Sequence, residues 1–322
     1  MTKTNARNER IKRDYFSYMR EARRYSDASI DGVAKALHRF ETYTRFKEFK
    51  AFHISQAVGF KNHLAKQGNE RTGQPLSKAT LYSTLNALRN FFHWLAGRPG
   101  FRSRIAYADA EYFNLSRKET RIAKATQERP GPTLEQIRHV IRQMPNQSDI
   151  NRRNRALLAF AILTGARDGA IASLKLKHID LIENKVVQDA REVKTKFSKT
   201  FTTYFFPVGN DFREIVVNWV TYLREEKLWG LNDPLFPSTN VGLDHEGGFA
   251  ATGLSRTHWS GAGPIRKIFL DAFSNAGLPY FNPHSFRNTL VLIGENTCEK
   301  VEDFKAWSQN LGSYARIWCL SI

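Results

Sequence analysis

Apolar residues recur at the spacing of packed helices throughout the first third of the chain. This pattern predicts helices over residues 6–45, 54–67 and 78–96, and Ser77 stands at the N-cap position of the last one. Glycine and proline directly after this segment end the helical pattern. We therefore expect residues 1–115 to form a compact domain built of helices alone.

A change of composition marks the end of this domain. Residues 116–132 read SRKETRIAKATQERPGP, which is rich in charge and has no sustained apolar face. The stretch ends in Pro130-Gly-Pro132, and Thr133 follows as the N-cap of a new helix. We interpret residues 116–132 as a basic linker that leads into a second domain over residues 133–322.

The second domain mixes helical spacing with one alternating stretch. An apolar helix over residues 154–164 is stopped by Gly165, and a short helix is expected from Asp168. Residues 186–208 alternate like two strands around a lysine-rich turn. Further helices are expected over residues 211–228, 263–276, 283–295 and 302–309. The predicted fold class is mainly α with a small β-sheet.

Positive charge is concentrated in the first domain. The chain has 49 Lys and Arg against 31 Asp and Glu, and residues 1–130 hold 26 of these bases and 12 of these acids. Such an excess favours a polyanion as partner, because each neutralised phosphate releases a condensed counterion. DNA or RNA is the first candidate, and a merely soluble basic protein is the alternative.

Cysteine content and hydropathy point to a cytoplasmic protein. Cys298 and Cys319 are the only cysteines, too few for a zinc site or a disulfide framework. The longest apolar run, residues 156–163, is far shorter than a bilayer span, and the chain opens with charged residues instead of an apolar signal core. We expect no contact with a membrane.

Three short features carry candidate phosphate chemistry. Arg167 follows the glycine that ends the apolar helix, so packed helices can hold its guanidinium toward a phosphate. His284 and Arg287 share one face at the start of a helix capped by Asn282, where an anion binds well. Lys194, Lys196 and Lys199 crowd the predicted turn, and a lysine there can protonate a leaving alkoxide. Each feature alone also occurs as an ordinary surface turn.

Together, in this order and spacing, the three features resemble the tyrosine recombinases, the phage-integrase family of site-specific DNA recombinases. The resemblance covers essentially the whole chain, and its motifs lie in LLAFAILTGARDGAIASLKLKHIDL and NPHSFRNTLVLI. It implies a helical core-binding (SAM-like) domain over residues 1–115, followed by an α+β catalytic domain over residues 133–322.

The resemblance also implies a site and a mechanism. Arg167 matches the first catalytic arginine, His284 and Arg287 match the HxxR motif, and Lys199 is our choice for the hairpin lysine, with Lys196 as the fallback. In this family two arginines neutralise the scissile phosphate, a tyrosine attacks it to leave a 3′-phosphotyrosine, and no metal or nucleotide cofactor is needed. The implied partner is double-stranded DNA, on which homo-oligomers (dimers or tetramers) assemble to integrate or excise a mobile element.

Residues 313–322 depart from the family pattern. Family members continue from Leu-Gly into His or Trp, whereas Ser313 follows Gly312 here, and Ile322 stands where the nucleophilic tyrosine is expected. Tyr314 is the candidate nucleophile, although it lies much closer to Gly312 than usual. Ala170 also replaces a residue that is often acidic in the family. We expect an impaired nucleophile site, and truncation, frameshift and divergence stay open as its origin.

Three classes of protein fit these observations. The first is a recombinase that cleaves and rejoins DNA, with Tyr314 or a tyrosine from another protomer as the nucleophile. The second is a recombinase remnant that only binds DNA. The third, a type IB topoisomerase, shares the chemistry and needs the same tyrosine.

Overall fold

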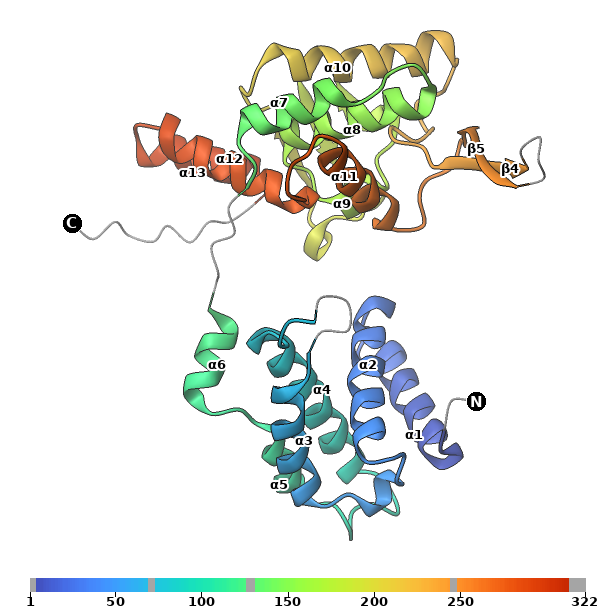
Figure 1. Cartoon of the computed structure of the whole chain (residues 1–322), viewed down its shortest axis with the longest axis vertical. Helices are drawn as coiled ribbons and strands as arrows, with labels where there is room; N and C mark the ends of the chain where they lie inside the picture. Colours follow the sequence, from blue (N-terminus) through green and yellow to red (C-terminus); the bar gives the residue numbers. More distant parts are fainter. Residues whose placement is uncertain (1–3, 69–72, 126–130, 244–247, 313–322) are drawn as a thin grey trace. The chain divides into compact units, whose positions relative to one another are not determined.

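Two compact units, Met1–Gln127 and Glu128–Ile322, make up the chain (Figure 1). Each unit has its own hydrophobic core. The division falls inside the linker expected from composition, while the function of each domain stays a prediction. The computed structural model describes residues 4–68, 73–125, 131–243 and 248–312.

The first unit is helical, as its apolar spacing predicts. The helix expected over residues 6–45 is divided, because the left-handed backbone of Arg24 (φ 53°) stops one helix and Ser26 caps the next. A turn of π-helix, Tyr18–Ala22, lies just before this break. The helices are α1 (Ala6–Ser17), α2 (Asp27–Tyr43), α3 (Ile54–Lys66), α4 (Lys78–Ala96), α5 (Tyr107–Ala110) and α6 (Arg117–Lys124).

Aromatic rings fill the core of the first unit. The Phe92 ring of α4 lies with its centroid 4.1 Å from that of Phe52, 5.4 Å from that of Phe113 and 5.5 Å from that of Phe40 in α2. All four side chains are buried. Such packed rings bury large apolar areas and fix the angles at which helices meet. The basic side chains of this unit are therefore carried by a scaffold with a well-packed interior.

Part of the stretch expected as a linker is helical. Ser116 accepts from the Glu119 backbone amide, and the Glu119 carboxylate accepts from the Ser116 amide, which is a capping box at the start of α6. Lys78 of α4 forms an ion pair with Glu119 at 3.2 Å. The capping box stabilises this short helix, although the helix has no apolar face of the ordinary width. The segment packs on α4 and does not form an open tether.

The second unit is built around α8 (Asp149–Thr164), whose residues 156–164 are all buried. The other helices of this unit are α7 (Leu134–Gln143), α9 (Asp168–Ile171), α10 (Asn210–Thr221), α11 (Gly263–Asn275), α12 (Pro283–Thr297) and α13 (Val301–Asn310). Helices α7, α10 and α12 pack against α8, and α11 packs on α7 (Figure 1). A helix that is apolar on every side belongs in a core, which explains its central place.

A small antiparallel sheet accompanies these helices. Its strands β1 (Ile179–Asp180), β2 (Lys185–Gln188) and β3 (Phe201–Tyr204) lie in that order, with Val186 paired to both Ile179 and Thr203. The alternation over residues 186–208 therefore predicts β2 and β3 correctly, although the strands are shorter and the connection longer than expected. A mainly α fold with a small sheet is confirmed.

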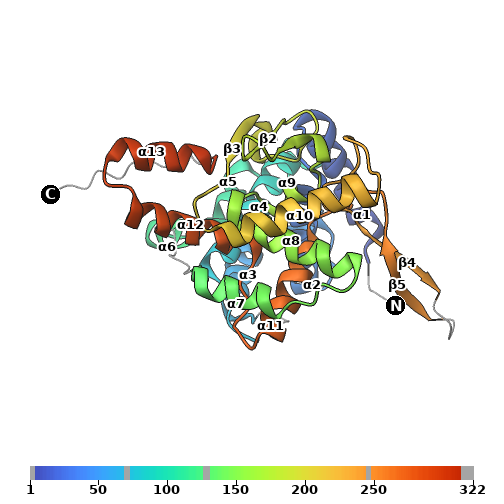
Figure 2. The same ribbon diagram turned by 90° about the horizontal axis from the view of Figure 1, so that it is seen from above.

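A second hairpin was not expected from the sequence. Strands β4 (Thr239–Leu243) and β5 (Phe249–Leu254) pair antiparallel and extend away from the helices of their unit in two perpendicular views (Figures 1 and 2). Val241, Leu243 and Phe249 are exposed, so no buried face imposes the alternation by which strands are recognised. Within the described residues, no helix is long and apolar enough to span a membrane.

Candidate active site

The turn that carries Arg167 is shaped by Gly165. Gly165 has a left-handed backbone (φ 58°), and a Cβ there would lie 2.6 Å from a Leu311 methyl carbon. Glycine meets both demands without strain. The Thr164 hydroxyl accepts from the Ala166 amide at 3.1 Å and tightens the turn. Arg167 follows as the N-cap residue directly before α9. It is half-buried, and burial lowers the pKa of its guanidinium.

Helix α12 starts as its sequence predicts. The Asn282 side chain accepts from the Ser285 amide at 3.2 Å, and Pro283 occupies the first turn. This start places His284 at the surface and Arg287 in the interior, where Arg287 is only 5% exposed. The Arg287 guanidinium donates to the carbonyl oxygens of Gly165 and Leu311. It therefore joins the α8–α9 turn to the end of α13.

The charges of these residues influence one another. Burial and the nearby charge of Arg167 lower the pKa of Arg287 to about 10. Partial burial, with the charges of Arg287, Arg167 and Lys196, lowers the pKa of His284, which Asp168 opposes. Such coupling requires short separations. The first arginine, the HxxR pair and one lysine of the turn therefore meet at one place, although they lie far apart in the sequence.

A cavity of about 500 Å³ opens beside this cluster. Its lining includes Arg167 together with Lys196 and Lys199, and it contains no acidic side chain among the described residues. Lys194, in contrast, donates weakly to the Ser260 carbonyl at 3.5 Å. Lys199, chosen from the sequence as the hairpin lysine, and its fallback Lys196 both border the cavity, and the choice between them stays a prediction. The candidate nucleophile Tyr314 lies outside the described residues.

Two hydrogen bonds attach the base of the turn that carries these lysines. The Ser173 hydroxyl accepts from the Lys194 amide at 2.9 Å, and the Thr200 hydroxyl accepts from the Ala190 amide at 3.0 Å. At the tip, Phe197 (φ 61°) and Ser198 (φ 50°) are both left-handed, which costs roughly 1 kcal/mol or more for each residue. The tip of the turn therefore holds some backbone strain beside the cavity.

Asn310 is a positioning residue that sequence reasoning missed. Strand β3 is an edge strand, and the Asn310 side chain accepts from the Tyr204 amide at 2.7 Å and donates to the Tyr204 carbonyl at 2.9 Å. The Thr203 hydroxyl donates to the Asn310 carbonyl at 3.0 Å. These bonds hold the end of α13 on the sheet, so Gln309 and Gly312 border the cavity. An asparagine in the last turn of the helix is the only signal that the sequence offers.

Comparisons with known proteins show the fold. No protein-family model matches the chain, and no curated protein sequence matches it. Among solved structures, a lambda integrase dimer bound to a COC′ core site aligns at 14% identity over 96% of this chain and 92% of that chain, with a TM-score of 0.63.

Two further structures agree. The Tn1549 transposon integrase in complex with circular intermediate DNA aligns at 12% identity over 94% of this chain and 92% of that chain, with a TM-score of 0.58. A lambda integrase tetramer bound to a Holliday junction aligns at 13% identity over 94% of this chain and 76% of that chain, also with a TM-score of 0.58. The chain therefore has the fold of the tyrosine recombinases.

Proposed function

We propose that this protein is a site-specific DNA recombinase that cleaves and rejoins strands through a 3′-phosphotyrosine intermediate. The observation that supports it best is the cavity bordered by Arg167, Lys196 and Lys199, with His284 and Arg287 in electrostatic reach. A cavity with several cations and no acidic lining suits a phosphodiester, whose transition state gains negative charge.

Each residue has a proposed part in this chemistry. Arg167, half-buried and bordering the cavity, offers its planar guanidinium to the scissile phosphate. Arg287 adds positive charge close to Arg167 and donates to the Gly165 and Leu311 carbonyls. Lys199, or Lys196, donates a proton to the leaving 5′ oxygen, and His284, neutral near pH 7 because its pKa is lowered, is able to accept one.

The proposed nucleophile is Tyr314. Tyr314 is two residues beyond Gly312, which borders the cavity. A tyrosine attack conserves the energy of the phosphodiester in the covalent intermediate, so that a second strand can be joined without a cofactor. A tyrosine supplied by another protomer would serve the same chemistry.

A second candidate function is DNA binding without cleavage. It is favoured by Ile322, which stands where the resemblance places the tyrosine. Such a protein would occupy its DNA site and block or join an intact recombinase.

The proposed partner is duplex DNA, bound by dimers or tetramers of this chain, in the integration or excision of a mobile element. The structures it resembles include an integrase dimer and an integrase tetramer on DNA. The net charge of +18 supports binding to a polyanion. Cys298 is a free thiol, which accords with the reducing cytosol proposed as the setting.

A covalent-capture experiment tests the proposal. Duplexes that the protein selects from a random library are remade as suicide substrates, nicked so that cleavage cannot be reversed, and complexes are separated on a denaturing gel. We expect a covalent complex that is absent with Tyr314→Phe and with Arg167→Ala. A complex that persists with Tyr314→Phe assigns the nucleophile elsewhere. Selective binding without any covalent complex supports the second candidate, and the absence of selective binding contradicts both.

A further inference from the structure

An exposed phenylalanine stands at the tip of the lysine-rich turn. Phe197 borders the cavity of the candidate active site, together with Arg167, Lys196 and Lys199. It is 79% exposed, although phenylalanine is among the residues most often buried in folded proteins. Its ring therefore offers an open apolar surface at the edge of a cavity that also carries three cations.

The backbone of Phe197 is unusual for so large a side chain. Its left-handed conformation (φ 61°, ψ 24°) is uncommon for any residue except glycine, and a bulky residue rarely adopts it. Neither packing in the core nor the geometry of the turn accounts for a phenylalanine at this position. Strained residues of this kind are often found where a site contacts its ligand. The ring is therefore a candidate for contact with the substrate.

The Phe197 ring is presented together with a positive charge. The Lys196 ammonium lies 4.9 Å from the centre of the ring, so a cation–π contact favours the two side chains lying side by side. Phe201 of β3 borders the same cavity and is partly exposed, which extends its apolar side. A ligand that joins an anion to a flat apolar group would meet both kinds of surface. A nucleotide of DNA, with its phosphate and its base, is such a ligand.

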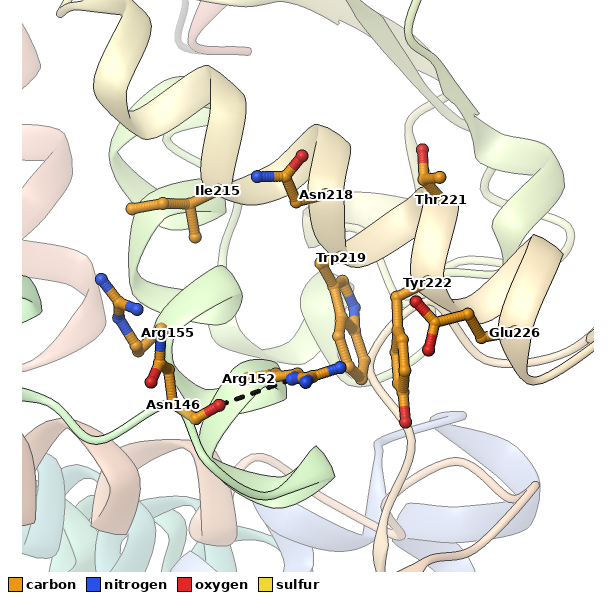
Figure 3. A pocket seen from close by; sticks show the side chains of 9 residues that line it. All are labelled: Asn146, Arg152, Arg155, Ile215, Asn218, Trp219, Thr221, Tyr222 and Glu226. Atoms are coloured by element: carbon orange, nitrogen blue, oxygen red, sulfur yellow. Dashed lines mark hydrogen bonds between the residues drawn. The ribbon is translucent and has the colours of Figure 1, made fainter.

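Aromatic rings at two other cavities are not open in this way. Trp219 borders a cavity of about 380 Å³, but it is only 2% exposed and its ring stacks on that of Tyr222 with 5.9 Å between centroids (Figure 3). Trp307 borders a cavity beside α13, and its ring lies 4.8 Å from that of the buried Phe206. Both rings pack against core side chains, whereas Phe197 lies almost wholly in solvent.

We propose that the Phe197 ring stacks on the base next to the scissile phosphate and thereby makes cleavage depend on the local base step. This inference rests on the proposed function, because it takes the phosphate in the cavity to be that of DNA. Apolar side chains that enter a base step unstack it, and pyrimidine–purine steps such as TA are unstacked most easily. We therefore expect efficient cleavage where such a step flanks the scissile phosphate.

A fluorescent base tests whether the ring unstacks DNA. The cleavage position is first mapped by covalent capture, and 2-aminopurine, whose fluorescence rises when it is unstacked, then replaces each base beside it in turn in intact duplexes. We expect the fluorescence at one position to rise when the full-length parent protein binds, and to stay near that of the free duplex with Phe197→Ala. No rise with the parent, or an equal rise with Phe197→Ala, would overturn the proposal.

Cleavage rates give a second measurement. Suicide duplexes that differ only in the step beside the scissile phosphate, TA or GG, are compared. We expect the parent to cleave the TA duplex faster. Phe197→Ala should cleave the TA duplex about tenfold more slowly than the parent, because a contact between an aromatic ring and a base is lost, and should show little preference between the two duplexes. Phe197→Tyr, which keeps a ring, should retain the rate and the preference. A preference that persists undiminished in Phe197→Ala contradicts the proposal.

A matched control removes an equally exposed ring elsewhere. Phe249 in β5 is 84% exposed and is not part of the cavity lining, so Phe249→Ala should leave fluorescence and cleavage unchanged. We expect Phe197→Ala to melt at the temperature of the parent, because its ring makes little contact with the core. If the parent forms no covalent complex with any duplex, the proposed function fails and this inference fails with it. If the parent cleaves DNA and Phe197→Ala cleaves it equally fast, only this inference fails.

Discussion

At the scale of single residues, the two arginines of the candidate site differ in what they do for the fold. Arg287 is buried and satisfies two carbonyl oxygens, whereas no hydrogen bond or ion pair of the Arg167 side chain occurs among the described residues. A donor that is removed from buried carbonyls leaves their desolvation uncompensated. A loss of activity in an Arg287 variant can therefore come from lost chemistry or from lost stability. A loss in an Arg167 variant can be assigned to chemistry alone.

We predict that Arg287→Ala lowers the free energy of unfolding of the second unit by about 3 kcal/mol, and that Arg167→Ala changes it by roughly 0.5 kcal/mol or less. Urea unfolding followed by circular dichroism measures both. Arg167→Ala should also reduce strand cleavage by about 10²- to 10³-fold while DNA affinity is kept. Equal destabilisation by the two variants would contradict the bonding of Arg287.

His284 gives the site a dependence on pH. Its pKa in the folded protein is lowered by partial burial and by the charges of Arg287 and Arg167, so below about pH 6.5 the unfolded chain binds the proton more readily. The stability that neutral His284 contributes is therefore complete above about pH 6.5 and is lost as the pH falls through the lowered folded pKa. NMR titration of the imidazole should give a midpoint below about 6.5. In Arg167→Ala the midpoint should rise, and no rise would show that the two charges do not interact.

At the scale of elements, the Asn310 side chain and the Thr203 hydroxyl attach the end of α13 to the sheet. Asn310 occupies both backbone groups of Tyr204 on the free edge of β3 and thereby takes the place of a further strand. Gly312 then passes so close to the Phe201 ring that a Cβ would lie 2.7 Å from it. The geometry of the cavity therefore depends on a contact between segments that are 106 residues apart.

We expect Asn310→Leu to cost about 1 to 3 kcal/mol, because it leaves a backbone N–H and a carbonyl of β3 without their partners. Hydrogen exchange of the Tyr204 amide should become faster in this variant. Gln309→Leu, at an exposed neighbouring position, serves as the control and should leave that exchange unchanged. Unchanged exchange in Asn310→Leu would mean that other contacts hold α13 in place.

Local sequence patterns predicted the helix ends that depend on neighbouring residues. They missed the features that depend on contacts between residues far apart in the sequence. Helices α4, α8 and α12 begin or end where Ser77, Gly165 and Asn282 indicate, because capping involves neighbours in sequence. The β4–β5 hairpin has no buried face, so its apolar residues carry no readable period. The meeting of Arg167 with the HxxR pair followed only from the family resemblance. The Asn310 contact had no local signal beyond an asparagine in the last turn of its helix.

At the scale of the whole molecule, each unit has its own hydrophobic core, and the two parts of the chain also differ in net charge. The first unit has a core of its own around Phe92, the second a core around α8, and the larger excess of basic residues lies in residues 1–130. Domains with separate cores need not unfold together. Trp94 is the only tryptophan in residues 1–127, so it reports on the first unit alone.

We predict two unfolding transitions in urea. The difference in fluorescence between the parent and Trp94→Phe follows the first unit, and the fluorescence that remains in Trp94→Phe follows the second. We expect their midpoints to differ, and Arg287→Ala to shift only the second one. A single transition shared by both signals, shifted as a whole by Arg287→Ala, would show that the two units unfold as one.

The hydrogen bond between Arg287 and the Gly165 carbonyl has a consequence for the nascent chain. The two residues are 122 positions apart, and ribosomes add about 5 to 20 residues each second. Gly165 is thus synthesised about 6 to 24 s before Arg287, which donates to its carbonyl. During that interval the apolar surface of α8 that α12 later covers is open to other chains. Slow translation between the two motifs would lengthen this exposure, and chaperones that bind apolar helices would act within it.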